Sequence, residues 1–238
     1  MNVNKEKGIS SFGVVACVRK ITGQKKAGHT GTLDPLATGL LTVCLGRATR
    51  VVQYLTAQRK TYLAIVELGT STDTYDAEGQ ITASGDYSAV TEKDILAALE
   101  IFKGAILQRP PIYSAIKQNG ERLYKTARRG ETVELPLRNV NIYRLELTGF
   151  KPPQITLEVE CGKGTYIRSL AFDLGQVLGC EAHLKGLSRL ANGPFQLEDA
   201  VTLTQLTKAV ENGSWHSLVK PIDSALTELE VIKLDAEQ

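Results

Sequence analysis

The order of predicted strands and helices constrains the fold of this 238-residue chain more than any other feature. The segment 60–69, KTYLAIVELG, alternates between apolar and other residues, which predicts a half-buried strand. The segments 138–150 and 154–162 show strand patterns on either side of Pro152–Pro153 and predict a hairpin. Because strands and helices follow one another without regular βαβ alternation, we expect an α+β fold with a mixed sheet.

Helical segments lie between these strands. At 91–104, Thr91 and Asp94 form the sequence pattern of a capping box, and Gly104 is a stop signal. The remaining expectations are a helix from Ser10 or Ser11 to Gly23, a strand at 40–46, helices at 48–58 and 202–213, a strand that continues as a helix at 165–179, and a strand followed by a turn at 181–195.

Composition excludes several classes of protein. No window of 18 apolar residues predicts a membrane span, and the N-terminal segment lacks the apolar core of a secretion signal. The four cysteines form no C-x-x-C pair, and the three histidines do not cluster with them. We therefore expect a cytoplasmic protein with reduced, structural cysteines and no metal site.

Charge is distributed unevenly along the chain. Residues 1–50 contain eight Lys and Arg against two acidic residues, and residues 103–138 contain eight against three. Residues 192–238 show the opposite balance, three against eight. Basic segments confined to parts of a chain are typical of proteins that bind a polyanion on one face, although a solvated mixed surface is the alternative.

One acidic residue stands in an unusual loop. The stretch 28–41, GHTGTLDPLATGLL, places Asp34 directly before a proline and between glycines. Pro35 disfavours the α region at Asp34, and the glycines allow tight turns and close backbone approach. Asp34 is thus either a carboxylate presented at a strand end or the capping residue of its own turn.

The sequence motifs of several other enzyme classes are absent. The chain contains no P-loop or Rossmann glycine pattern, no nucleophile elbow, and no second acid in a comparable motif. The remaining candidates for a functional site are one acid, several Tyr and Arg residues, and a basic segment at about 109–138 that is interrupted by prolines and glycines.

Five blocks of the sequence resemble, in order, those of the TruB family of bacterial tRNA pseudouridine-55 synthases. They are GHTGTLDPLATGLL, KTY with LGTSTDTYDAEG, QRPPIYSAIKQNGERLYKTARRG, GKGTYIRSLAFDLG and HLKGLSRLANGPF. Together they lie within roughly residues 5–200, and five ordered matches are far more specific than any single block.

The resemblance implies a role for each matching position. Asp34 is similar to the catalytic aspartate, Arg168 to the arginine paired with it, and Tyr62 to the tyrosine that stacks on the target base and is a candidate for proton removal. Tyr166 is similar to the tyrosine of the same motif as Arg168. Leu187 is similar to an apolar residue of the uracil pocket.

Two further positions are implied to bind substrate. His29 resembles the histidine that helps to hold the opened T-loop. Lys5 lies in a stretch similar to the family's early K-P-x-G motif, but Glu6 stands where that motif has proline, so the chain adds an acid there.

The resemblance also implies an architecture and partners. We expect a pseudouridine synthase fold: one catalytic domain over 1–238, with a mixed, largely antiparallel central sheet flanked by helices. The basic segment at about 109–138 is implied to be a thumb-like insertion, mobile in the free protein, that clamps RNA. The substrate is the T-loop and stem of tRNA. No cofactor, metal, guide RNA or membrane is expected, the protein is expected to be a monomer, and the family's usual C-terminal RNA-binding domain is expected to be absent.

The residues alone leave alternatives open. Tyr62 and Leu187 are also typical of a core, Arg168 of a surface ion pair, and His29 of a turn. The carboxylate could attack the sugar C1′ or the base C6, or deprotonate the sugar. Two other functions compete with a stand-alone enzyme, namely a non-catalytic tRNA-binding module and a guide-dependent synthase within a ribonucleoprotein.

Overall fold

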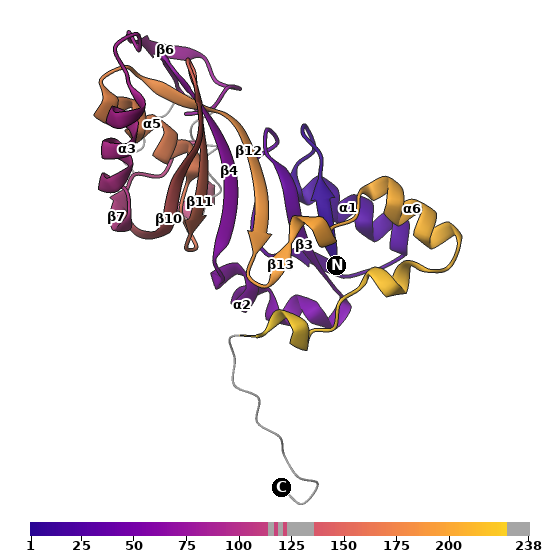
Figure 1. The fold of residues 1–238 in the computed structure, drawn as a ribbon. Coiled ribbons are helices and arrows are strands. Elements are labelled where there is room, and N and C mark those ends of the chain that lie inside the picture. The colour runs from indigo at the N-terminus through magenta and orange to yellow at the C-terminus, as the bar shows by residue number, and fades with distance from the viewer. Residues whose placement is uncertain (114–116, 119–120, 123–135, 228–238) are drawn as a thin grey trace, which may run out of the picture. The chain divides into compact units, whose positions relative to one another are not determined.

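The computed structural model describes residues 1–113, 117–118, 121–122 and 136–227. The chain divides into two compact units (Figure 1). Unit 1 comprises residues 1–58 and 190–238, and unit 2 comprises residues 59–189. Strand β12 (Ala182–Asn192) runs from unit 2 into unit 1, so its last three residues belong to the latter.

Unit 1 is built on strand β3. Its elements are β1 (Asn2–Lys5), α1 (Ser11–Thr22), β2 (Ala27–His29), β3 (Thr38–Leu45), η1 (Gly46–Val51), α2 (Val52–Ala57), β13 (Phe195–Gln196), η2 (Leu197–Asp199), α6 (Leu203–Glu211), η3 (Trp215–Leu218) and η4 (Asp223–Ala225). Both β1 and β2 pair with β3 in antiparallel register. Valines on one face of α1 pack with Leu206 of α6 and with Val43 of β3, which closes the core of this unit.

Unit 2 is built on a five-stranded antiparallel arrangement. Its elements are β4 (Lys60–Leu68), β5 (Thr70–Thr72), β6 (Ile81–Ser84), α3 (Glu92–Ile101), β7 (Gly104–Gln108), β8 (Lys117–Gln118), β9 (Glu121–Arg122), β10 (Arg138–Lys151), β11 (Gln154–Cys161), α5 (Ile167–Leu178) and the first part of β12. The strand order is β12-β4-β11-β10-β7.

Burial alternates along β4, where every second residue from Lys60 to Leu68 is buried. Helices α3 and α5 pack against each other and lie along the sheet, α3 beside β10 and α5 beside β4 (Figure 1). The apolar faces of both helices are buried, with Ile95 and Leu174 fully covered. Burial of these faces supplies the main driving force for this unit.

The α+β prediction is confirmed. The pairs β1–β3, β2–β3, β4–β11, β7–β10 and β10–β11 are antiparallel, and parallel pairing occurs at the isolated bridges of Val3 with Val201 and of Asp76 with Leu184. The capping box of Thr91 and Asp94 is present, although α3 ends at Ile101, before the expected glycine. The hairpin of β10 and β11 lies where the sequence predicted it.

Two predicted elements differ from the structure. The segment 48–58 is not one α-helix, because residues 46–51 form a 3₁₀ helix before α2. The strand expected at the start of the segment 165–179 is absent from this described segment. The side chain of Gln108, rather than a neighbouring strand, forms hydrogen bonds with the backbone N–H and C=O of Tyr166.

The expected thumb falls largely outside the described residues, which omit 114–116, 119–120 and 123–135. All four cysteines are free thiols, and Cys44, Cys161 and Cys180 are buried. Among the helices of the described residues, none is both long and apolar enough to cross a membrane.

Candidate active site

Asp34 lies in the loop of unit 1 that connects β2 with β3. The residue is partly buried, whereas Leu33 and Leu36 on either side of the Asp34–Pro35 step are buried. The N–H of Ala37 donates to the C=O of Asp34 at 3.0 Å and closes a turn. The two buried leucines and this turn give the aspartate a defined place in the loop.

Two groups hold the backbone of this loop from the chain segment before it. The hydroxyl of Ser11 donates to the C=O of Leu33 (3.0 Å) and accepts from its N–H (2.8 Å). The N–H of Gly8 donates to the C=O of Pro35 at 2.8 Å. Both anchors form hydrogen bonds with backbone atoms of the loop and none of these bonds involves the Asp34 carboxylate.

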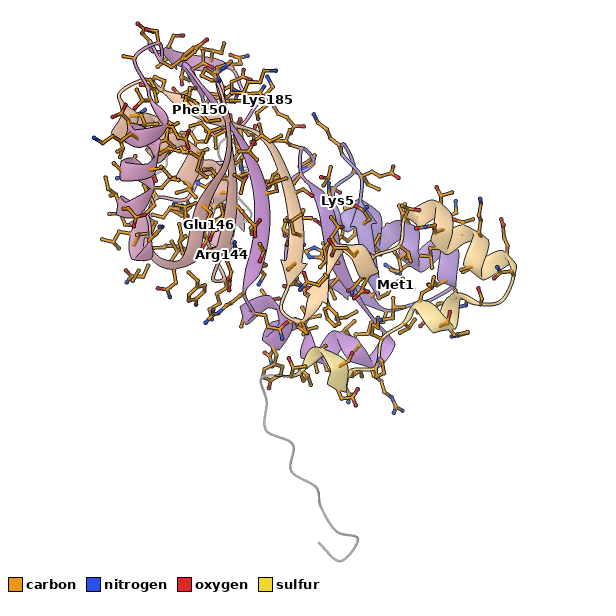
Figure 2. The ribbon with its side chains drawn as sticks, viewed as in Figure 1. Met1, Lys5, Arg144, Glu146, Phe150 and Lys185 are labelled. Atoms are coloured by element: carbon orange, nitrogen blue, oxygen red, sulfur yellow. The ribbon has the colours of Figure 1, made fainter. Side chains whose placement is uncertain are left out.

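Lys5 provides a third anchor (Figure 2). Its side chain is buried, and its ammonium donates to the carbonyl oxygens of Glu6 (3.0 Å), Pro35 (3.3 Å) and Ala37. A buried ammonium is tolerated when its three donors find acceptors, as they do here. The expected contact of Lys5 with RNA stays a prediction.

His29 is partly buried on β2, opposite Val43 of β3. Its Nδ1 accepts a hydrogen bond from the N–H of Gly31 at 3.3 Å. Its expected role in holding the T-loop stays a prediction.

Tyr62 and Leu187 lie on strands of unit 2 that run in opposite directions. The N–H of Gly69 donates to the C=O of Glu181, and the ammonium of Lys185 lies 2.6 Å from Oε2 of Glu67. Because the later residue of β12 meets the earlier residue of β4, the two strands are antiparallel. Tyr62 points to the buried face of β4 and is 8% exposed, whereas Leu187 is partly exposed. This burial of Tyr62 is compatible both with core packing and with a base-stacking role.

Arg168 is held in a buried network at the first turn of α5. Its Nη1 donates to the C=O of Thr74 (3.1 Å) and lies 3.4 Å from Oδ2 of Asp76, and its Nη2 donates to the C=O of Tyr113 (2.9 Å). The side chains of Arg168 and Asp76 are each 6% exposed. The alternative of a surface ion pair is therefore wrong, and the guanidinium has a fixed direction.

Asp76 is a residue to which sequence reasoning gave no role. Its Oδ1 accepts from the hydroxyl of Thr74 (2.7 Å) and from the N–H of Glu78 (3.0 Å), which leaves Oδ2 toward Arg168. Tyr75, in the left-handed region at φ 63°, stacks on Phe172 of α5 at 4.2 Å. The block DTYDAEG was a sequence signal, but nothing distinguished Asp76 from the nearby Asp73.

Two further charged residues of unit 2 have shifted pKa values: Lys60 is buried, and Asp173 is partly buried. Burial lowers the pKa of Lys60 to about 8, with the neighbouring Arg189 acting in the same direction. Burial also raises the pKa of Asp173 on α5 to about 6, against the opposing effect of Arg109. Sequence reasoning missed both groups, because burial of Lys or Asp leaves no periodic signature.

The expected site residues are divided between the two units. Unit 1 contains Lys5, His29 and Asp34, and unit 2 contains Tyr62, Tyr166, Arg168 and Leu187. Within unit 2, the neighbours Tyr166 and Arg168 occupy the start of α5. The pairing of Asp34 with Arg168 remains a prediction. No group of three or more His, Cys, Asp or Glu suited to a metal ion occurs among the residues that the structure describes.

Comparison with known proteins gives two family matches in succession. Residues 19–167 match the family described as TruB family pseudouridylate synthase (N terminal domain). Residues 168–227 match the tRNA pseudouridylate synthase B C-terminal domain.

Curated relatives are similar over almost the whole chain. A protein of Dehalococcoides mccartyi named tRNA pseudouridine synthase B is 49% identical over 100% of this chain and 79% of its own length. One of the same name from Syntrophobacter fumaroxidans is 43% identical over 99% of this chain and 77% of its length.

Solved structures show the same fold. The chain matches one in a crystal structure of a Cbf5-Nop10-Gar1 complex with a TM-score of 0.76 and 33% identity, over 96% of this chain and 61% of that one. It matches a chain of an H/ACA RNP bound to a substrate RNA containing 2'-deoxyuridine with a TM-score of 0.73 and 30% identity, over 96% of this chain and 61% of that one.

Proposed function

The chain belongs to the TruB family of pseudouridylate synthases, and we propose that it acts on the T-loop uridine at position 55 of tRNA with Asp34 as the reacting carboxylate. In coarser terms it is an enzyme that isomerises a uridine of tRNA to pseudouridine. The observation that carries the assignment of Asp34 is its loop, whose backbone is anchored by Lys5, Gly8 and Ser11. Anchoring of this kind supports precise placement of a reacting group.

The reaction requires a carboxylate that can be charged. The C1′–N1 bond of the uridine breaks, the uracil turns, and a new bond forms from C1′ to C5; C5 then loses its proton and N1 gains one, so that the product is an isomer of the substrate. Asp34 serves in its ionised form, by attack at C1′ or at C6 or by deprotonation of the sugar. A guanidinium such as that of Arg168 favours an ionised carboxylate nearby, and we propose that it takes this part.

The uridine must leave the stack of its loop to reach the carboxylate. Extrusion of a base costs a few kcal/mol. Stacking of the extruded base on an aromatic ring stabilises it by about 1–3 kcal/mol, and we assign this contact to Tyr62. Tyr166 and Leu187 complete the uracil pocket in this proposal, His29 and Lys5 contribute to binding of the T-loop, and contacts of Lys and Arg with phosphates offset the remainder in a salt-dependent way.

The decisive experiment uses purified protein and an unmodified tRNA transcript. Wild-type protein should form pseudouridine at one T-loop position, which nucleotide mapping detects. Asp34→Asn should reduce the single-turnover rate at least about a thousandfold and leave the tRNA dissociation constant within about threefold. Product formed at the wild-type rate by this variant would refute the role of Asp34.

The same assay addresses a second candidate, a synthase that needs a guide RNA within a ribonucleoprotein. The similarity to a chain of an H/ACA RNP is the observation that favours it. That candidate predicts no product on bare tRNA, whereas our proposal predicts product without guide RNA, cofactor, metal or partner protein. A protein that binds tRNA but never forms product would instead be a non-catalytic module.

A further inference from the structure

We propose that Gln108 is a positioning residue for the isomerisation, because its side-chain amide fixes the backbone of Tyr166 and thereby the first turn of the helix that carries Arg168. The inference rests on the proposed function of Tyr166 and Arg168. Gln108 itself is the last residue of β7 and is 1% exposed.

The contact between the two residues is reciprocal. The N–H of Tyr166 donates to Oε1 of Gln108 at 2.8 Å, and Nε2 of Gln108 donates to the C=O of Tyr166 at 3.0 Å. The amide can satisfy both backbone groups in only one orientation, so this geometry also assigns its oxygen and nitrogen. Gln108 thus takes the place that a neighbouring strand would occupy.

Tyr166 needs such a partner because of where it lies. It is the N-cap of α5, with extended backbone angles (φ −105°, ψ 110°), and its own side chain makes no capping hydrogen bond. Its C=O also accepts the first helical bond, from the N–H of Leu170 at 3.1 Å. The Gln108 amide therefore fixes both the extended residue and the start of the helix.

Two more hydrogen bonds join the segment after Gln108 to the same helical turn. The hydroxyl of Ser169 donates to the C=O of Arg109 at 2.7 Å, and Nη2 of Arg168 donates to the C=O of Tyr113 at 2.9 Å. The segment 108–113 and the first turn of α5 thus hold each other at three points. Of these contacts, only that of Gln108 binds both backbone groups of Tyr166, its N–H and its C=O.

Loss of this contact should act on rate rather than on affinity. Displacement of a reacting or positioning group by about 1 Å can cost about a hundredfold in rate. Gln108→Met keeps the approximate size and loses both hydrogen bonds. Gln108→Glu is isosteric, and in its ionised form the carboxylate can accept from the N–H of Tyr166 but cannot donate to the C=O.

The test measures single-turnover pseudouridine formation and tRNA affinity for each folded variant. We expect Q108M and Q108E to lose about 10- to 100-fold in rate, with dissociation constants within about threefold of wild type. Gln154→Met is the matched control, because Gln154 is an exposed glutamine of the same unit that bonds to Glu67 on the surface. It should keep the wild-type rate.

Stability is separated from positioning by Ile95→Val, which removes one methylene from the buried face of α3. This variant should lower the melting temperature and keep the rate at temperatures where it is folded. A wild-type rate in Q108M or in Q108E with an ionised side chain, or an equal loss of rate in I95V, would overturn the inference. Wild-type protein without any activity would instead refute the proposed function.

Discussion

The loop that carries Asp34 and the helical turn that carries Arg168 are held in different ways. In unit 1, Lys5, Gly8 and Ser11 bind backbone atoms of the loop. In unit 2, the functional side chain itself is bound, since the guanidinium of Arg168 contacts the Asp76 carboxylate and two carbonyl oxygens.

These two kinds of anchoring predict different effects of substitution. Several backbone anchors share the Asp34 loop, so the loss of one of them should lower stability first. Contacts with a functional side chain fix its direction and its local charge, so their loss is felt in the chemical step as well. The following predictions test this distinction.

The largest effect is expected for Asp76→Asn. This change removes the carboxylate that lies 3.4 Å from Nη1 of the buried Arg168, and breaking a buried ion pair costs about 3–5 kcal/mol. We expect the free energy of unfolding, measured with urea, to fall by about 3 kcal/mol, and the single-turnover rate of the folded variant to fall about tenfold or more.

Glu146→Gln is the control for this prediction. Glu146 pairs with Arg144 on β10 at 2.8 Å, but the two side chains are 53% and 38% exposed (Figure 2). Exposed pairs contribute about 0–1 kcal/mol, so neither stability nor rate should change much. Equal effects of the buried and the exposed variant would contradict the distinction.

A smaller effect, mainly on stability, is expected for Lys5→Met. Methionine fills a similar volume but leaves the carbonyl oxygens of Glu6, Pro35 and Ala37 without their shared donor. We expect a loss of about 2 kcal/mol in the free energy of unfolding.

The rate of folded Lys5→Met should stay within about threefold of wild type, because the other anchors of the loop remain. Lys7→Met, at an exposed position of the same segment, should leave both quantities unchanged. A rate loss for Lys5→Met as large as that for Asp76→Asn would contradict the proposed difference between the anchors of the Asp34 loop and the contacts of the Arg168 side chain.

The smallest effect is expected for Asp173→Asn, and it depends on pH. Burial raises the pKa of Asp173 to about 6, above the value of about 3.9 in unfolded chains. The folded state therefore binds the proton more tightly, and this contribution to stability is present below about pH 4 and lost as pH rises to about 6.

At pH 7.5 the wild-type protein bears the cost of the buried charge, so Asp173→Asn should raise the free energy of unfolding by about 1 kcal/mol there and by much less at pH 4.5. Thermal unfolding at both values measures this. Asp86→Asn, where Ser88 lowers the pKa of an exposed carboxyl group, should show no such gain. A gain for Asp173→Asn that is independent of pH would contradict the assignment.

Much of the fold was predictable from sequence because its signals are local. The alternation along β4, the capping box of Thr91 and the glycine stop of α1 each involve neighbours within a few residues. The 3₁₀ helix at 46–51 was missed because it shares its sequence preferences with an α-helix.

Periodicity, caps and ordered blocks can all be recognised along one chain, so most of the elements, the loop of Asp34 and the family were predictable without the fold. The groups that hold the candidate residues were not, because they meet only in the folded chain. Lys5 reaches Ala37 across 32 positions, Gln108 reaches Tyr166 across 58, and Arg168 reaches Thr74 across 94. Contacts at such separations depend on how strands and helices pack, and one sequence contains no local signal that names the partner.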